Sequence, residues 1–240
     1  MPGLLKQTLN PTLYRYLVQI YKETIAGFNN KSYSQEGEDM ILRRIFEHQQ
    51  KGFYIDVGAH HPKRFSNTYY FYRRGWKGIN IDCSPGSMDL FKTKRKNDIN
   101  LECAISDKFE QLKLHTYNEP AINTFVPDLW SGQTTNYVLM KTIEMETVTL
   151  EYVLSQYLKK DKTIDFLSID VEGMDINVLR SNNWELFRPK IVLVEDVSSN
   201  EEFISGSKIT QFMNSQAYVL YAKTVNTLIF RERFFYPFGN

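Results

Sequence analysis

The sequence lacks several features that would assign it to a class of protein directly. It contains only two cysteines, Cys83 and Cys103, which excludes a disulfide framework and a thiolate metal site. No run of about 18 apolar residues is present, which excludes a membrane-spanning helix. The formal net charge is only +1, so the chain as a whole has no electrostatic attraction for nucleic acid or an anionic membrane. We therefore expect two free thiols and no nucleic-acid partner.

We also expect no signal peptide, because the first residues lack a basic-then-apolar pattern. We expect a cytoplasmic protein, and contact with a membrane surface stays open. The composition, 42% hydrophobic and 24% charged, is that of an ordinary globular protein. We expect a helical extension over residues 1–31 and one domain over residues 32–240. In the extension, apolar residues at helical spacing form a stripe along one helix face: Leu13, Leu17, Ile20, Tyr21 and Ile25. The stripe would pack on the domain, form a homodimer contact or touch a membrane surface.

Short apolar runs alternate with helical patterns along the domain, which predicts a parallel sheet with helices on both faces. The expected strands are 53–57, 78–82, 99–105, 112–116, 146–150, 164–170, 190–195, 218–222 and 227–231. The expected helices are 34–46, 66–72, 88–96, 151–158, 176–179 and 209–214, the first of them capped by Ser34. Residues 117–143 form a long irregular stretch, which predicts either a lid or binding loop or a disordered insertion. A basic cluster is expected on the solvated face of a helix: Lys92, Lys94, Arg95 and Lys96.

Three of the expected strands end in a carboxylate, at Asp56, Asp82 and Asp170. The carboxyl ends of parallel strands lie at one edge of the sheet, where ligands bind in open α/β folds. Gly58 follows the first strand and allows the backbone to turn tightly beside a ligand. Asp82 comes 24 residues later, close to the spacing at which an acid on the second strand binds ribose hydroxyls. These residues predict a nucleoside-binding pocket at this edge.

The turn after the first strand lacks the G-x-G-x-x-G series that encloses a dinucleotide pyrophosphate. Gly58 stands alone there and is followed by His60, His61 and Pro62. This absence counts against a nicotinamide-dependent dehydrogenase, which shares the strand order and the acid on the second strand. A nucleoside cofactor without phosphates needs a less close backbone approach, and S-adenosylmethionine is the common one.

Six motifs, in order, resemble the FkbM-type methyltransferases over about residues 32–200. They are Ser34–Asp39, Phe53–Ala59, Gly75–Asp82, Cys103–Asp107, Ile169–Gly173 and Arg188–Val192. The chain departs from the common family pattern at four places. Many members have Asn where this chain has His60, and Glu-Pro near the position of Asp82. Many have Lys at the position of Ser168, and Glu often stands at that of Asp175.

The resemblance implies a Rossmann-like class I methyltransferase fold, α/β with a mostly parallel seven-stranded sheet. It also implies S-adenosylmethionine as methyl donor and a hydroxyl of a sugar, glycan or other natural product as acceptor. The residues that the motifs place in the donor pocket are Gln35, Asp56, Gly58, Asp82, Ala104, Ile105, Ser106 and Asp107, with Ala104 to Asp107 beside the adenine. Those placed on the substrate side are His60, His61, Asp170 and Glu172.

A sugar hydroxyl is a poor nucleophile until a base takes its proton. Either His60 or His61 suits that role, because imidazole titrates near neutrality; Asp170 or Glu172 would orient the histidine or act directly. The structural alternatives are a loop histidine that only bonds the backbone and a Glu172 that caps the next helix.

We expect no metal ion. The alternative is a metal site made of the two histidines and the two acids on the substrate side. An N-methyltransferase for an amino-sugar or amino-acid unit and a catalytically silent binding module of the same fold also stay open. Three aromatic residues in or near residues 117–143 would either stack on a sugar or pack in the protein: Phe125, Trp130 and Tyr137. We expect a small-molecule or glycan acceptor and allow for a homodimer.

Overall fold

A computed structural model describes residues 9–27, 29–130, 136–159, 161–196, 204 and 206–237. Its contacts divide the chain into two units, Met1–Ser32 and Tyr33–Asn240. The first unit contains helix α2 (Pro11–Tyr21), continued by a π-helical turn, η1 (Lys22–Ala26). Asn10 caps α2, because its side-chain oxygen accepts a hydrogen bond from the Thr12 backbone N–H at 2.9 Å. No residue of α2 is buried. Among the described residues, no helix is both long and apolar enough to cross a membrane.

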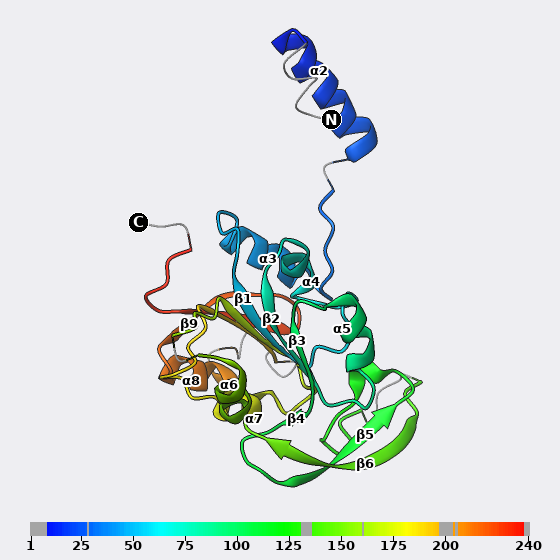
Figure 1. The fold of residues 1–240 in the computed structure, drawn as a ribbon, viewed down its shortest axis with the longest axis vertical. Helices are drawn as coiled ribbons and strands as arrows, with labels where there is room; N and C mark the ends of the chain where they lie inside the picture. The colour runs from blue at the N-terminus through cyan, green and yellow to red at the C-terminus, as the bar shows by residue number, and fades with distance from the viewer. Residues whose placement is uncertain are drawn as a thin grey trace. The chain divides into compact units, whose positions relative to one another are not determined.

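The second unit is built on a seven-stranded sheet in the order β3-β2-β1-β7-β8-β10-β9 (Figure 1). Strands β3, β2, β1, β7 and β8 run parallel, and β10 runs antiparallel to both of its neighbours. The bounds are β1 Phe53–Val57, β2 Lys77–Asp82, β3 Ile99–Glu102, β7 Phe166–Ile169, β8 Ile191–Glu195, β9 Tyr218–Lys223 and β10 Thr227–Glu232. The sheet confirms the predicted mostly parallel, Rossmann-like fold.

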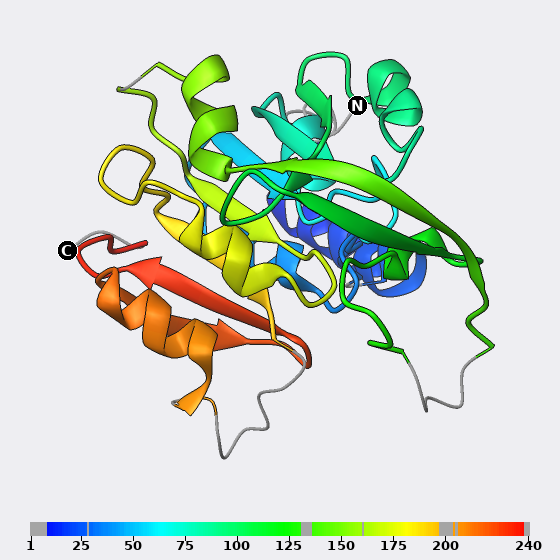
Figure 2. The same ribbon diagram turned by 90° about the horizontal axis from the view of Figure 1, so that it is seen from below.

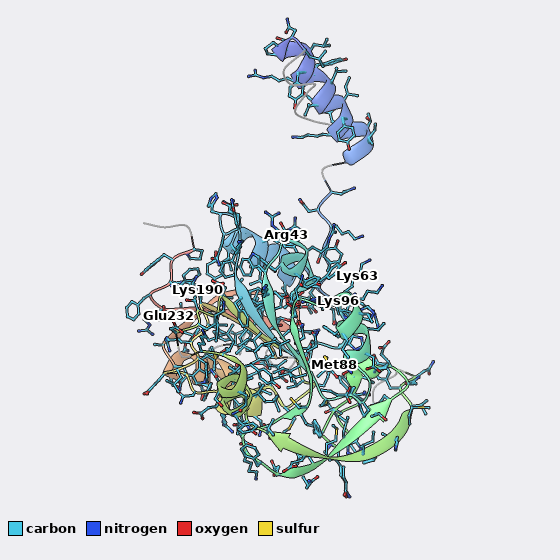
Figure 3. All side chains as sticks on the ribbon, in the orientation of Figure 1. Arg43, Lys63, Met88, Lys96, Lys190 and Glu232 are labelled. Atoms are coloured by element: carbon cyan, nitrogen blue, oxygen red, sulfur yellow. The ribbon has the colours of Figure 1, made fainter. Side chains whose placement is uncertain are left out.

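Helices cover both faces of this sheet. Side chains alternate along each strand, so Ile55 packs into one hydrophobic cluster and Tyr54 into a second. Helices α6 (Leu150–Tyr157), α7 (Asp175–Arg180) and α8 (Lys208–Ser215) supply the first cluster and lie together in Figure 1. Helices α3 (Glu38–Ile45) and α4 (Tyr69–Arg73) supply the second. Figure 3 shows that side chains fill the space between the sheet and these helices.

A smaller three-stranded sheet lies beside the carboxyl ends of the parallel strands, in the order β4-β6-β5. Its strands are β4 Ala104–Ile105, β5 Gln111–Tyr117 and β6 Leu139–Val148. Strands β5 and β6 form the long antiparallel ribbon seen in Figure 2. The single strand predicted over 99–105 is therefore wrong: it divides at Cys103 into β3 and β4, which belong to different sheets.

Three other predictions need correction. Residues 117–143 are not irregular throughout, because they include a 3₁₀ turn, η2 (Pro120–Ile122), and the start of β6. The N-cap of α3 is Gly37 rather than Ser34; the Ser34 hydroxyl instead bonds the backbone and carboxylate of Asp39. Arg95, predicted on a solvated face, is fully buried at the end of α5 (Met88–Lys94), where polar side chains surround its guanidinium.

Candidate active site

The turn after β1 is fixed by Gly58, whose φ is 83°. A Cβ atom added there would lie 1.7 Å from the carbonyl oxygen of Asp170, so only glycine fits. The backbone N–H groups of Gly58 and Ala59 both donate to the carbonyl of Ile81, at 2.9 and 3.0 Å. The turn is thus held between the ends of β2 and β7, as the sequence predicted for a ligand-binding strand end.

Asp82 ends β2 and faces this turn. Its Oδ2 atom accepts a hydrogen bond from the His60 backbone N–H at 2.9 Å, and its Oδ1 atom accepts one from the Ser84 N–H at 2.8 Å. Each carboxylate oxygen has two acceptor positions, so Asp82 retains the capacity to bind the hydroxyls of a ribose.

A pocket opens at the carboxyl ends of β1, β2 and β7, and Gly58 and Asp82 line it. One wall is apolar and includes Cys83, Cys103 and Ile105, a surface suited to a planar base. Burial raises the pKa of Cys103 to about 11 and also raises the pKa of Cys83. Both cysteines are free thiols.

The same pocket is also lined by titratable groups that follow β1 and β7: His60, Asp170 and Glu172. The backbone is strained here, because His60 has a φ of 48° and Glu172 a φ of 54°. Non-glycine residues rarely adopt this left-handed region, and such residues concentrate at functional sites. Groups that would bind a nucleoside and groups that would move a proton therefore line the same pocket.

The segment 120–125 contributes to the pocket lining, and Phe125 is among the residues that line it. Asn123 donates from Nδ2 to the Ser84 hydroxyl at 3.0 Å, and the Thr124 hydroxyl donates to the Glu172 carbonyl at 2.6 Å. The segment is therefore tied to residues that follow β2 and β7. The rings of Trp130 and Tyr137 pack edge to face, with centroids 6.0 Å apart.

The two adjacent histidines have different environments. His61 accepts backbone N–H groups of Lys63 and Arg64 at its Nδ1 atom, at 3.1 and 2.9 Å, so it caps its own turn. His60 lines the pocket, and burial is the main cause that lowers its pKa below the usual range. Its Nε2 atom lies 3.4 Å from a guanidinium nitrogen of Arg64, and a neutral imidazole released from that contact accepts a proton at neutral pH. His60 is therefore the better-placed base.

The acids form a second cluster, in which Asp170 and Glu172 are joined by Glu195 from the end of β8. One carboxylate oxygen from each lies within 4.8 Å of the others. Burial, and then the neighbouring acids, raise the pKa of Glu172 to about 9 and that of Glu195 to about 8, and raise the pKa of Asp170. The sequence reasoning missed Glu195, although β8 ends in an acid exactly as three predicted strands do. Neither histidine belongs to this group, so the predicted alternative metal set is not assembled among the described residues.

We expect this cluster to make stability fall with rising pH. The pKa of Glu172 in the folded state lies above its ordinary value of 4.5, so its stabilising contribution is complete below pH 4.5 and is lost as the pH rises towards about 9. Glu172→Gln should therefore raise the thermal midpoint at pH 8 and leave it nearly unchanged at pH 5. The thermal midpoint should rise by about 2–4 °C for each kcal/mol regained in the free energy of unfolding, as measured by differential scanning calorimetry.

Glu185→Gln provides the control, because Glu185 is exposed and should show no such pH-dependent gain. Equal midpoints for Glu172→Gln and the unsubstituted protein at pH 8 would contradict the raised pKa.

The remaining predicted residues lie around this pocket without lining it. Gln35 lines a neighbouring pocket together with Glu195, and the two pockets share Asp170. Asp56 is buried, accepts a hydrogen bond from Thr68 at 3.0 Å, and has its pKa raised to about 6 by burial. Ala104 and Ser106 are buried, while Asp107 is exposed. Their assignment to donor binding stays a prediction.

The residues present fit S-adenosylmethionine. Its ribose suits Asp82, its adenine suits the apolar wall, and its cationic groups suit Asp170, since a positive charge beside a carboxyl favours the ionised form. The Oδ1 atom of Asp170 supports this fit, because it is buried and has no hydrogen-bond partner among the described residues; buried polar atoms normally have one. Asp82, Ile105 and Asp170 would hold the donor, which supplies an electrophilic methyl group.

The fold and this pocket define the class of a Rossmann-like, S-adenosylmethionine-dependent methyltransferase. The model of the methyltransferase FkbM domain matches residues 56–220, more than half of the chain. The protein therefore belongs to the FkbM methyltransferase family, as the six motifs predicted.

Solved structures give more distant similarities, and no curated protein matches the chain. An O-methyltransferase from Bacillus cereus in complex with SAH is 11% identical, with a TM-score of 0.39, and the match covers 95% of this chain and 94% of that one. A putative RNA methyltransferase from Pyrococcus horikoshii is 10% identical, with a TM-score of 0.43 and coverage of 91% and 98%. A TehB-like SAM-dependent methyltransferase from Corynebacterium glutamicum is 12% identical, with a TM-score of 0.37 and coverage of 93% and 100%.

Proposed function

We propose that this methyltransferase acts on a hydroxyl of a sugar or glycan. The observation that carries the proposal is the shared pocket, which is lined both by Asp82, suited to the ribose of the donor, and by His60, suited to act as a base. During methyl transfer, an acceptor alcohol needs a base to take its proton. The electrophilic methyl group of the donor needs only to be aligned with the acceptor oxygen. A pocket wall with a neutral imidazole supplies that base.

His60 is the base in this proposal. At neutral pH the carboxyl of Glu172 holds its proton, because its pKa is raised to about 9, so it does not compete for the hydroxyl proton. His60 has a lowered pKa and is unprotonated at the same pH. It accepts the hydroxyl proton as the acceptor oxygen bonds to the methyl carbon. The negative charges of Asp82 and Glu119, which favour the protonated form of His60, stabilise the imidazolium that results.

The matched pair His60→Asn and His61→Asn tests this role. Asparagine tolerates the left-handed backbone of residue 60, and its side-chain oxygen can replace the backbone cap made by His61. We expect His60→Asn to lower turnover by about 10²–10⁴-fold and His61→Asn to leave it within a few-fold. Donor affinity, measured by calorimetry, should be unchanged in both.

Turnover is measured by mass spectrometry of isotope-labelled methyl transfer into a panel of nucleotide sugars and glycan fragments. Base-labile methyl esters or methylated amines as the products would contradict hydroxyl methylation. Full turnover in His60→Asn would remove the imidazole from the mechanism and leave the donor site intact.

A further inference from the structure

Helix α2 exposes an apolar stripe. Leu13, Leu17 and Ile20 follow the i, i+4, i+7 spacing of one helix face and are 47%, 45% and 37% exposed. Tyr16 and Tyr21 are also exposed, and helical periodicity places them on opposite edges of the stripe. Tyrosine is favoured at such edges where one side of a surface is apolar and the other is wet.

The opposite face of this helical segment carries two basic side chains, Arg15 in α2 and Lys22 at the start of η1. Arg15 and Lys22 are separated by seven residues, so they lie on one face, away from Leu13 and Leu17. The first 32 residues contain four basic side chains and one acidic one, which gives them a net charge of +3. Because the whole chain sums to +1, the remainder carries −2. The cationic charge is therefore concentrated on the segment that carries the apolar stripe.

A helical pair with a second copy of the chain fits these residues poorly. A coiled-coil seam through Leu13, Tyr16 and Ile20 would next contain Glu23, and a seam through Leu17 and Ile20 would next contain Thr24. Neither seam reaches the three or four heptads that a coiled coil requires. Two such segments would also bring like net charges together.

We propose that α2 binds the surface of a membrane rich in anionic lipids, lying in the plane of the interface. An interfacial helix combines an apolar face, flanking aromatic residues and a basic polar face, and α2 has all three. Leu13, Leu17 and Ile20 enter the boundary between headgroups and acyl chains, while Arg15 and Lys22 contact the headgroup phosphates. The inference concerns the first unit alone and does not depend on the acceptor of the methyl group.

Sedimentation of the full chain with phospholipid vesicles tests this proposal. We expect the protein to pellet with vesicles of phosphatidylcholine mixed with phosphatidylglycerol, and much less with phosphatidylcholine alone. Leu17→Gln with Ile20→Gln should abolish pelleting, since glutamine keeps the helix propensity of leucine and removes the apolar face. Arg15→Gln with Lys22→Gln should weaken binding to the anionic vesicles about tenfold or more.

Thr12→Ala with Gln19→Ala is the matched control, because it alters two uncharged side chains on the polar part of the helix and should leave pelleting unchanged. Unchanged calorimetric binding of S-adenosylmethionine shows that each variant is folded. The proposal is overturned if the unsubstituted protein stays in solution with anionic vesicles. It is equally overturned if sedimentation velocity shows a dimer that the Leu17→Gln, Ile20→Gln variant converts to a monomer without any vesicle binding.

Discussion

Gly58→Ala should destabilise the protein by about 2–6 kcal/mol, the sum of a strained positive φ and an overpacked contact. The contact is severe because the new Cβ would meet a backbone carbonyl oxygen, that of Asp170, at 1.7 Å. The backbone at the end of β7 is held by a hydrogen bond from the Asp170 N–H to the Val57 carbonyl, so its atoms cannot rotate away as a side chain can. Equilibrium unfolding in urea measures the loss, and calorimetry should show that donor binding is lost with it.

Gly75→Ala separates the two causes. Gly75 has almost the same backbone conformation, with a φ of 87°, and an added Cβ meets nothing within 4 Å. It should therefore cost only the backbone strain, about 1–3 kcal/mol. If both alanine variants lose the same stability, the close approach of the β1 turn to the end of β7 is not what requires glycine at position 58.

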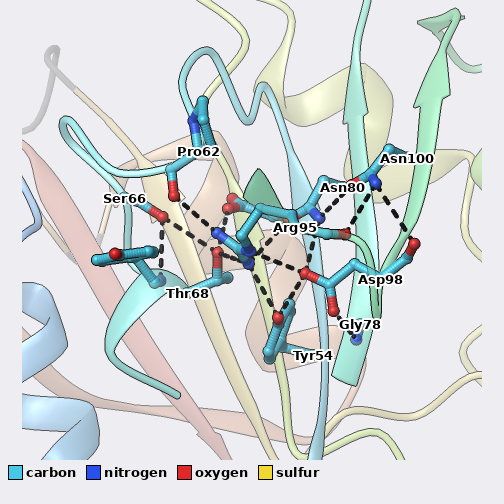
Figure 4. A network of polar contacts seen from close by, with 11 residues as sticks. Tyr54, Pro62, Ser66, Thr68, Gly78, Asn80, Arg95, Asp98 and Asn100 are labelled. Atoms are coloured by element: carbon cyan, nitrogen blue, oxygen red, sulfur yellow. Dashed lines mark hydrogen bonds and ion pairs between the residues drawn. The ribbon is translucent and has the colours of Figure 1, made fainter. Parts of the chain in front are cut away.

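Arg95→Met should have the second large effect, because it breaks a network buried under the β1 turn (Figure 4). The guanidinium donates to Asp98 at 2.9 Å, to the Tyr54 and Thr68 hydroxyls at 2.9 Å, and to the Pro62 carbonyl at 3.1 Å. Both charged side chains are fully buried. Removing one partner of a buried ion pair leaves an uncompensated charge, which costs about 3–5 kcal/mol.

Arg188→Met is the control for this prediction. Arg188 pairs with Glu232 at 3.2 Å but stays 33% exposed, so its loss should cost about 1 kcal/mol or less. Adding Asp98→Asn to Arg95→Met should recover part of the stability, because it removes the stranded charge. No recovery in the double variant would show that the hydrogen bonds to Pro62 and Thr68, rather than the charge pair, hold this region together.

The Arg95 network also connects stability to the site. Thr68 bonds both Arg95 and Asp56, and the positive charge of Arg95 opposes the rise in the pKa of Asp56. Pro62 follows the two histidines of the β1 turn. Arg95→Met should therefore weaken donor binding even under conditions in which the protein stays folded.

The sheet could be predicted from the sequence because its central strands are short apolar runs that end in acids. Phe53–Val57 and Ile191–Glu195 are almost entirely buried, and such runs have few alternatives in an α/β chain. The division at Cys103 could not be predicted, since no glycine or proline marks the point where β3 ends and the chain moves to the smaller sheet. Strand pairing over long sequence distances decides it.

The site was predictable in part, for a similar reason. A strand-end acid has a defined place, so Asp82 and Asp170 could be located from the sequence. His60 and His61 differ because only the His61 imidazole is shown accepting backbone N–H groups. Two adjacent identical residues give no indication in the sequence of which one does so. Arg95 was misplaced because a basic residue in a cluster of lysines is usually solvated, and only tertiary contacts with Tyr54 and Asp98 reverse this.

The thiols of the apolar wall bear on whether the methyl donor alkylates the enzyme's own side chains. Cys83 and Cys103 line the pocket that we assign to the methyl donor, an alkylating agent, and a thiolate is a far better nucleophile than an alcohol. Burial keeps the pKa of Cys103 at about 11 and raises that of Cys83, so both sulfur atoms stay protonated and unreactive at neutral pH. The same low-polarity wall that suits a nucleobase thus protects the enzyme from self-inactivation.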